Sequence, residues 1–352
     1  MNFFPRRSGR MSPRKLTPKP FDPMAYLPLD LVAAVTDVRV ERPIIVQEEA
    51  ERRKRRSVPA PRGTLVILAA DHPARNVLSL KDDPLGIADR HAYLARILRV
   101  LTYPGVDGVM GTPDLVEDLF ILTRLVKERG GPALLDDRLL VGCMNRGGLK
   151  GTCFEMEDTF TAFTTERMQA LRMDGAKFMF RLDPKDPASG RTLLACADAV
   201  SQCVRADLTA FLEPLPVKKV GGKYVVQRTV ADLCGMVSVA SALGASSLNT
   251  WLKIPSCKGM ERVARATTLP ILILGGEVTG DTAPVLQDLH AAMRAGSSVR
   301  GALIGRNVIF PGHDDPRAMA AAVAALVHDR ADVKAAQEAM TTERGKEQHL
   351  LP

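Results

Sequence analysis

The sequence has few aromatic residues and no apolar stretch long enough to cross a membrane. Aromatic residues make up 5% of the 352 residues, with a single Trp. No run of about 18 apolar residues occurs, which is the length that a membrane-spanning helix needs. The basic start of the chain is not followed by the apolar segment of a signal peptide. We therefore expect a cytoplasmic protein without a membrane span.

Cysteine pairs, histidine clusters and a dinucleotide fingerprint are also missing. The cysteines stand alone along the chain, with no C-x-x-C pair, and should be reduced thiols rather than disulfides or zinc ligands. The histidines form no close pair, which argues against a metal-dependent mechanism. No G-x-G-x-x-G follows the first predicted strand, so dinucleotide binding has no support. We expect no cofactor.

Positive charge is concentrated at the N-terminus. The chain has a net charge of +8, and residues 1–62 hold 14 Lys and Arg against 7 Asp and Glu. The run Arg52–Arg56 could bind nucleic acid or an acidic partner, or it could be the solvated end of a helix. No aromatic residue interleaves with it, so the stacking surfaces of single-strand binders are missing and nucleic acid is not the expected partner. Residues 1–62 are predicted to form a basic extension with short helices at 29–38 and 44–56.

Residues 63–332 alternate short apolar runs with helical patterns. Such near-continuous apolar strands are typical of a parallel sheet that is buried on both faces. Eight strand–helix units can be counted, which predicts a (β/α)8 TIM barrel in the α/β class, with a doubly wound sheet as the alternative. A hairpin is expected at Gly221-Gly222, and residues 333–352 are expected to form a tail. The predicted strands lie at 64–70, 106–110, 139–144, 176–181, 208–212, 271–274 and 301–304, and one further strand, the sixth in order, holds Lys253.

Polar residues follow most of these strands. In a barrel the carboxyl ends of the strands meet at one site, however far apart they lie in sequence. Each such residue alone could instead cap a turn or pair at the surface, but polar groups at the ends of buried strands must find partners, and here they would find each other. The candidate residues are Asp71, His72, Asn145, Arg146, Lys177, Glu213, Lys253, Gly275, Gly276, Gly305 and Arg306.

Lys253 ends an apolar strand beside Trp251 and is followed by Ile254 and a proline. A lysine in this position is often a surface residue, but an apolar setting lowers a lysine pKa and favours the neutral amine that attacks a carbonyl. The next strand ends in Gly275-Gly276, where backbone N–H groups can approach a phosphate closely. A nucleophile and a phosphate site are thus predicted on adjacent strands.

These strand ends resemble the class I (Schiff-base) aldolases of the deoxyribose-phosphate and tagatose-bisphosphate aldolase superfamily, over residues 64–330. Five segments agree with this superfamily in residue type and in their order along the chain. They are the Asp-His after the first strand, Ala-Lys-Phe-Met-Phe, Phe-Leu-Glu-Pro, Leu-Lys-Ile-Pro and the closing Gly-Arg-Asn. Four longer segments and the basic extension are similar to an aldolase-like subgroup that accompanies inositol catabolism in actinobacteria. The segments are Ala-Asp-His-Pro-Ala-Arg, Cys-Met-Asn-Arg-Gly-Gly-Leu, Thr-Trp-Leu-Lys-Ile-Pro and Leu-Gly-Gly-Glu.

The resemblance implies roles for the catalytic residues. Lys253 would form an iminium with a ketose phosphate, and Lys177 would lie close by and lower its pKa. Glu213 would move protons, and Asp71 would orient substrate hydroxyls. The iminium stabilises the carbanion left by bond cleavage, so no metal is needed.

The resemblance also implies that Gly275, Gly276 and Arg306 bind phosphate, with His72, Asn145, Arg146 and Gly305 lining the substrate site. Pro73 departs from the pattern of archaeal-type relatives, which have glycine after Asp-His. The loop beside Asp71 is therefore expected to differ in shape, and with it the sugar that fits.

The implied function is a lyase that acts on a phosphorylated keto sugar, within a homo-oligomer. The expected reaction is cleavage of 5-dehydro-2-deoxygluconate 6-phosphate to dihydroxyacetone phosphate and malonic semialdehyde. One alternative is a relative that performs thiolase-like or condensation chemistry with the same lysine. Another is a non-catalytic protein that binds sugar phosphates or nucleic acid through the basic extension.

Overall fold

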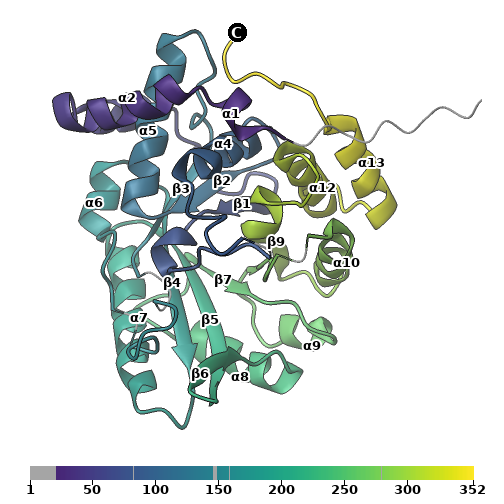
Figure 1. The fold of residues 1–352 in the computed structure, drawn as a ribbon. Helices are drawn as coiled ribbons and strands as arrows, with labels where there is room; N and C mark the ends of the chain where they lie inside the picture. The colour runs from purple at the N-terminus through teal and green to yellow at the C-terminus, as the bar shows by residue number, and fades with distance from the viewer. Residues whose placement is uncertain (1–20, 82, 146–148, 158, 279) are drawn as a thin grey trace, which may run out of the picture.

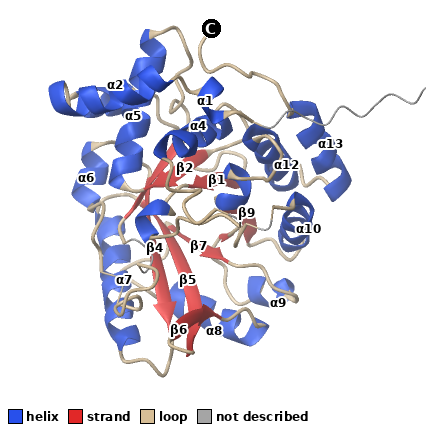
Figure 2. Ribbon diagram, in the orientation of Figure 1, coloured by secondary structure: helices blue, strands red, loops and turns tan. Residues whose placement is uncertain are grey.

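The computed structural model describes residues 21–81, 83–145, 149–157, 159–278 and 280–352. Eight parallel strands close into a barrel in the order β4-β3-β2-β1-β9-β8-β7-β5, and pairing of β4 with β5 completes the ring (Figures 1 and 2). This confirms the predicted TIM barrel. The barrel strands are β1 (Leu65–Ala69), β2 (Gly108–Gly111), β3 (Leu139–Cys143), β4 (Gly175–Leu182), β5 (Thr209–Val220), β7 (Thr250–Ile254), β8 (Ile271–Ile273) and β9 (Val299–Ile304).

Helices between the strands cover the outside of the barrel. Several begin at an Asp or Thr whose side chain accepts a hydrogen bond from the first turn, as Asp89, Thr229 and Asp281 do. Helix α12 packs beside α4 and α10 and is buried along most of its length. The helices of the barrel region are α4 (Arg90–Leu101), α5 (Pro113–Glu128), α6 (Thr165–Ala170), α7 (Ala188–Arg205), α8 (Val230–Ser241), α9 (Met260–Ala264), α10 (Thr282–Met293), α11 (Arg306–Ile309) and α12 (Pro316–His328), with the 3-10 turn η1 (Pro73–Arg75).

Alternation along the strands decides which side chains enter the barrel. The interior is filled by an apolar cluster that includes Ile67, Val141, Phe211, Leu272 and Leu303, while the intervening side chains pack against the helices. Successive side chains of a strand point to opposite faces. The next interior position along a strand therefore brings a polar side chain to the mouth of the barrel.

Two strands extend well beyond the barrel wall. Strand β5 continues to Val220 and pairs in antiparallel fashion with β6 (Lys223–Val226), and β4 and β5 are the long arrows that run toward β6 in Figure 2. The predicted hairpin is confirmed, because Gly221 and Gly222 both have positive φ and join Val220 to Lys223.

The described part of the N-terminal extension, residues 21–62, packs on the outside of the barrel. It contains α1 (Pro23–Tyr26), α2 (Leu29–Glu41) and α3 (Ile45–Arg52). Helices α2 and α3 lie against α5 and bury Leu31, Val35 and Ile45, and Figure 1 shows α2 crossing α5. The predicted helices are thus present, although the second ends at Arg52 and not at Arg56.

The basic run after α3 pairs with acidic residues at the amino ends of strands. Arg53 is 2% exposed and donates to Asp174, which precedes β4, at 3.1 Å. Arg56 lies 2.8 Å from Asp107, which precedes β2. Arg52, Lys54 and Arg55 remain exposed at the end of α3, so the interpretation of this run as a solvated helix end holds for these three residues and does not hold for Arg53 and Arg56. The interpretation as a nucleic-acid contact loses support, because Arg53 and Arg56 are already paired with acidic residues of the fold.

The C-terminal segment, expected to be a tail, forms helix α13 (Val333–Glu343), which packs beside α12 (Figure 1). Arg317 of α12 pairs with Glu343 at 3.2 Å and with Glu347 at 2.8 Å. These ion pairs hold the segment on the barrel. Over the described part of the chain, no helix combines the length and the hydrophobicity that a membrane crossing requires.

Candidate functional site

Four charged side chains form a continuous chain at the carboxyl end of the barrel. Lys177 Nζ lies 3.1 Å from Asp71 Oδ2 and 2.8 Å from Glu213 Oε2. Glu213 Oε2 also accepts a hydrogen bond from Lys253 Nζ at 3.0 Å. Two lysines and two carboxylates therefore alternate in sign, and the structure brings together four side chains that lie on four different strands or strand ends.

The barrel geometry explains this meeting. Asp71 is two residues beyond Ala69 of β1, and Glu213 is two residues beyond Phe211 of β5, so both follow interior positions. Lys253 follows Trp251 in the same way, and the Trp251 ring packs at 6.3 Å from the ring of Phe211. Lys177 points into the barrel and is 0% exposed.

The two lysines differ in pKa. Burial lowers the pKa of Lys253 and Lys177 lowers it further, while Glu213 opposes the shift. Burial also acts to lower the pKa of Lys177, but Asp71 and Glu213 outweigh it and raise that pKa above its usual range. Lys253 is therefore the lysine that loses its proton more easily.

The two carboxylates stay ionised. Burial would raise the pKa of Glu213, but the charges of Lys177 and Lys253 lower it to about 2. Lys177 and then Arg75 hold the pKa of Asp71 well below its usual range, again against burial. Glu213 is thus a carboxylate within proton-transfer distance of Lys253.

Asp71 keeps one oxygen available. Its Oδ2 pairs with Lys177, but its Oδ1 is buried and has no hydrogen-bond partner among the described atoms. A buried carboxylate oxygen is costly to leave unpaired. This atom is suited to accept a hydrogen bond from a bound hydroxyl group.

His72 supports the turn that ends β9. The Tyr93 hydroxyl lies 3.5 Å from its Nδ1, and burial lowers the pKa of His72 to about 3. A Cβ added to Gly305 would lie 2.4 Å from Cε1 of the His72 ring and 2.3 Å from the carbonyl oxygen of Ala69. His72 is therefore neutral at physiological pH. A side chain at position 305 would collide with His72 and Ala69, so glycine allows this turn to pack closely.

Asn145 holds two strands together. Its Nδ2 donates to the carbonyl oxygen of Met179, and its Oδ1 accepts from the Met179 N–H, both at 2.8 Å. Asn145 is 0% exposed. Its contacts align the end of β3 with β4 beside Lys177. The predicted site residue Arg146 lies outside the described residues.

The Gly275-Gly276 turn lies between β8 and α10. A Cβ on Gly275 would lie 2.3 Å from Cγ1 of Ile304, so glycine is required there for packing, and Gly276 has φ +71°. Arg306 Nη2 donates to the Gly276 carbonyl oxygen at 3.1 Å, and Asn307 Nδ2 donates to that of Gly275 at 2.5 Å. The predicted phosphate residues therefore touch one another.

A cavity of about 600 Å³ borders this turn. It is bounded by the β6 hairpin, the segment after β7 and helix α10. Its polar lining includes Arg228, Ser256 and Glu277. The turn is thus accessible from the side on which the β6 hairpin stands.

Two residues near the site were missed in the sequence. Arg75 stands in the segment Ala-Asp-His-Pro-Ala-Arg, and its charge acts on Asp71, Lys177 and Glu213. Asn307 follows Arg306 and anchors the glycine turn. Both residues lie within sequence segments that the resemblance uses. Their positions close to predicted site residues could have indicated that they belong to the site.

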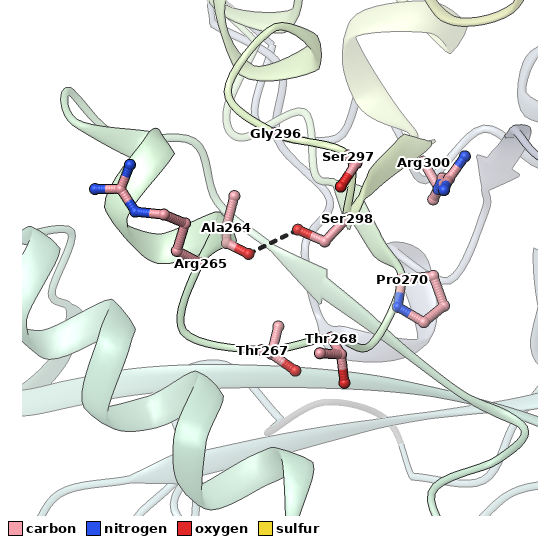
Figure 3. A pocket seen from close by; sticks show the side chains of 9 residues that line it. All are labelled: Ala264, Arg265, Thr267, Thr268, Pro270, Gly296, Ser297, Ser298 and Arg300. Atoms are coloured by element: carbon pink, nitrogen blue, oxygen red, sulfur yellow. Dashed lines mark hydrogen bonds between the residues drawn. The ribbon is translucent and has the colours of Figure 1, made fainter.

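A second cavity, of about 520 Å³, lies at the opposite end of the barrel, beside the amino ends of β8 and β9. Figure 3 shows Arg265 and Arg300 at opposite sides of it, with Ser298 turned toward Ala264. Ser298 Oγ donates to the Ala264 carbonyl oxygen at 2.8 Å, and Thr267 Oγ1 lies 2.8 Å from Ser241 Oγ. These hydroxyl groups therefore stabilise the loops at this end of the barrel.

Comparison with known proteins gives a family and several relatives. A halobacterial protein, the 2-amino-3,7-dideoxy-D-threo-hept-6-ulosonate synthase of Halobacterium salinarum, is 28% identical over 248 residues, which cover 68% of this chain and 90% of that protein. The 2-amino-4,5-dihydroxy-6-oxo-7-(phosphonooxy)heptanoate synthase of Streptomyces griseus is 32% identical over 109 residues, or 31% of this chain and 38% of that protein. Both relatives are named synthases.

Solved structures agree on the fold. An archaeal fructose 1,6-bisphosphate aldolase is 22% identical with a TM-score of 0.55, and the match covers 81% of this chain and 99% of that one. This likeness supports the barrel fold and nothing further. The structure of Cgl0159 from Corynebacterium glutamicum is 36% identical with a TM-score of 0.80, over 87% of this chain and 99% of that one. The inositol-catabolism subgroup stays a prediction. The Cgl0159-like family model matches residues 63–326, and the chain belongs to this family.

Proposed function

We propose that this protein is a class I aldolase whose Schiff-base residue is Lys253. The observation that carries the proposal is the position of Lys253, which is 5% exposed, has a lowered pKa and lies 3.0 Å from the carboxylate of Glu213. A buried amine of lowered pKa beside a base is the arrangement that amine nucleophiles need.

The chemistry follows from this geometry. Glu213 takes a proton from Lys253, whose Nζ then forms a bond to the ketone carbon of the substrate. Nζ and the protonated Glu213 each give one proton to the ketone oxygen, which leaves as water, and the new bond between Nζ and carbon becomes an iminium. Glu213, which is ionised again, then removes the proton of the hydroxyl on the second carbon from the iminium carbon. The bond between this carbon and the carbon next to the iminium breaks, and its electrons pass to the iminium. An aldehyde leaves, and protonation and hydrolysis of the enamine release the ketone product and restore Lys253.

Lys177 and Asp71 have supporting roles in this proposal. Lys177 stays protonated between Asp71 and Glu213, and its positive charge helps to keep the pKa of Lys253 low. The unpartnered Oδ1 of Asp71 accepts a hydrogen bond from a substrate hydroxyl. The substrate hydroxyl next to the breaking bond is thereby oriented within the barrel mouth.

We place the substrate phosphate at the Gly275-Gly276 turn and Arg306. A guanidinium group and backbone N–H groups suit the charge and the acceptor oxygens of phosphate. The name of the Streptomyces griseus relative supports a substrate of this class, because 6-oxo-7-(phosphonooxy) describes a ketone next to a phosphorylated carbon. The substrate predicted from the resemblance, 5-dehydro-2-deoxygluconate 6-phosphate, releases the same unit as dihydroxyacetone phosphate.

A condensation reaction is the second candidate. Two of the relatives are named synthases, which favours carbon–carbon bond formation with the same lysine. Both directions pass through an enamine on Lys253, so they share the site described above. Product analysis separates them.

Borohydride trapping tests the proposal. Incubation with a panel of ketose phosphates and borohydride, followed by peptide mass spectrometry, should show a reduced adduct on Lys253. Analysis of products without borohydride should then show either an aldehyde and a ketone phosphate or a lengthened ketose. Absence of any adduct with every member of the panel would refute the Schiff-base mechanism.

A further inference from the structure

A cavity of about 560 Å³, the rim cavity, lies between the loops that follow β1, β8 and β9. Its lining includes Lys81, Arg96 and Phe310, and every residue of the lining stands on a loop or on helix α4. The loops after β8 and β9 meet closely there, because a Cβ added to Gly312 would lie 2.5 Å from the Gly280 carbonyl oxygen. Since α4 belongs to the outer layer of helices, the rim cavity lies outside the ring of strands and apart from the four charged residues of the candidate site.

Arg96 reaches the rim cavity from α4 and contacts two aromatic rings. Its guanidinium carbon lies 5.1 Å from the centre of the Phe310 ring and 5.5 Å from that of the Phe21 ring. Aromatic rings contact the face of a guanidinium group, whereas its N–H donors point along its edges. The two rings therefore position Arg96 and leave its donors to find other partners.

The donors of Arg96 are poorly used. Within the described part of the chain, Arg96 makes one hydrogen bond, from Nη1 to the Ile309 carbonyl oxygen at 3.5 Å, and its buried Nε has no partner. The acidic residue that acts on it, Asp315, binds Arg99 through both oxygens, at 2.9 and 2.5 Å. Among the described residues Arg96 therefore has no ion pair, and a half-buried cation without a counter-charge is unfavourable.

The other charged side chains of the rim cavity are exposed. They are Lys81, Asp83, Asp281 and His313. Asp83 accepts a hydrogen bond from the Leu85 N–H at 2.9 Å. Asp281 accepts one from the Ala283 N–H at 2.9 Å and thereby caps α10. Both carboxylates are held by the backbone of their own loops and are screened by water, so Arg96 is the charge that a ligand meets inside the cavity.

We propose that the rim cavity is a second anion site, in which Arg96 binds inorganic phosphate or a small phosphate monoester that is not the substrate. The edge of a guanidinium group offers paired N–H donors that match the oxygens of phosphate. A volume of about 560 Å³ is typical of a pocket for a small metabolite. The proposal goes beyond the aldolase function, because its ligand needs no carbonyl group and no Schiff base.

Helix α11 separates this site from the phosphate position proposed for the substrate. Arg306 is the first residue of α11, and Ile309, whose carbonyl oxygen Arg96 contacts, is the last. The Phe310 N–H donates to the Arg306 carbonyl oxygen at 2.8 Å. The two sites thus lie on either side of one helical turn, and an experiment has to tell them apart.

Calorimetry measures binding of inorganic phosphate and of glycerol 3-phosphate, which has no carbonyl group. The variants are Arg96→Met, which keeps an apolar side chain beside the two rings, and Arg96→Lys, which keeps the charge. The control is Arg300→Met, because Arg300 is an exposed arginine in the cavity at the opposite end of the barrel. Borohydride trapping of dihydroxyacetone phosphate on Lys253 reports on the substrate site in the same variants.

The wild type should bind phosphate at two sites, and Arg96→Met should weaken one of them about 10- to 100-fold, the scale of one lost charge-assisted hydrogen bond. Arg96→Lys should keep part of this affinity, and Arg300→Met should match the wild type. The probe that binds this site more tightly identifies the ligand as the free ion or the monoester. Phosphate binding that is the same in Arg96→Met and in the wild type would overturn the proposal.

Thermal unfolding shows whether Arg96→Met is folded. Without phosphate this variant should unfold at the same temperature as the wild type or higher, since it removes a poorly paired cation and methionine packs well beside aromatic rings. Phosphate bound at the rim cavity should raise the unfolding temperature of the wild type and of Arg300→Met more than that of Arg96→Met. An equal rise in all three proteins would also contradict the proposal.

The outcomes separate the rim site from the aldolase mechanism. If Arg96→Met loses phosphate binding but the wild type gives no adduct on Lys253, the rim site stands and the Schiff-base mechanism fails. If both proteins give the adduct and bind phosphate equally, the mechanism stands and the rim site fails. If Arg96→Met weakens phosphate binding and trapping of dihydroxyacetone phosphate to the same extent, Arg96 belongs to the substrate site and the proposal of a separate ligand is overturned.

Discussion

Lys177 and Lys253 contact the same carboxylate oxygen, yet their pKa values move in opposite directions. Both Nζ atoms lie within 3.0 Å of Glu213 Oε2, at 2.8 and 3.0 Å. Lys177 has Asp71 as a second partner, which raises its pKa, whereas burial lowers that of Lys253. Two ammonium groups facing one cavity cannot both stay protonated without cost. The second carboxylate decides which lysine becomes the nucleophile.

Substitution of the nucleophile should remove activity and leave the fold. We expect Lys253→Ala to fold and to lose at least about a thousandfold in rate, because the base cannot promote the reaction without the covalent nucleophile. Circular dichroism checks the fold, and steady-state kinetics with borohydride trapping check the function. An adduct on Lys177 in the wild type would contradict the assignment.

The pH dependence should reveal the influence of Lys177. Its positive charge lowers the pKa of Lys253, so Lys177→Met removes that charge and should raise the pKa of Lys253. Because the neutral amine reacts, the acidic limb of kcat/KM should move to higher pH, and borohydride should still trap Lys253 there. Lys150→Met, which changes an exposed lysine, should leave the profile in place. An unmoved profile in Lys177→Met would show that burial alone lowers the pKa of Lys253.

At the scale of elements, the glycine turn after β8 is held by packing on one side and by hydrogen bonds on the other. A Cβ on Gly275 would collide with Ile304, and Arg306 and Asn307 donate to the two glycine carbonyl groups. The turn cannot move without disturbing these donors. Its shape and the phosphate site proposed beside it are therefore coupled.

Gly275→Ala should displace the turn and raise KM for a phosphorylated ketone more than for its unphosphorylated counterpart. Gly235 is the matched control, because it lies within α8 and has open space where a Cβ would stand. Gly235→Ala should keep activity and stabilise the protein by about 0.5–1 kcal/mol, since glycine is unfavourable inside a helix. Kinetics and urea unfolding measure the two effects. Equal KM values for wild type and Gly275→Ala would refute the coupling.

The elements show how far the sequence could predict the structure. The barrel strands were predictable because each is a buried apolar run, and the meeting of Asp71, Lys177, Glu213 and Lys253 follows from the barrel once the strand ends are aligned. The extension of β5 to Val220 was not predictable, because the last residues of this strand are exposed and lack an apolar pattern. The packing of His72 against Gly305 could not be predicted either, because it depends on contacts between strands that are far apart in sequence.

At the scale of the whole molecule, the described part of the N-terminal extension packs onto the barrel as one fold with it. Helices α2 and α3 cover α5, and the run after them reaches the amino ends of strands at the opposite end from the site. Arg53 donates to Asp174 and also to the carbonyl oxygens of Arg138 and Arg172. Deletion of residues 1–56 would therefore remove packing and ion pairs as well as positive charge.

Arg53→Met should destabilise the protein without changing the chemistry of the site. Arg53 is buried, and its loss leaves the buried Asp174 with Arg55 as its remaining cationic partner, at 3.0 Å. Removing one member of a buried ion pair costs about 3–5 kcal/mol; because Arg55 remains, we expect the lower part of that range. Arg52→Met is the control, since its exposed pair with Glu48 at 3.7 Å should contribute no more than about 0.5 kcal/mol. Urea unfolding gives the free energies, and kcat at a temperature where both variants are folded should equal that of the wild type. Equal stability of Arg53→Met and Arg52→Met would mean that the basic run does not hold the extension on the barrel.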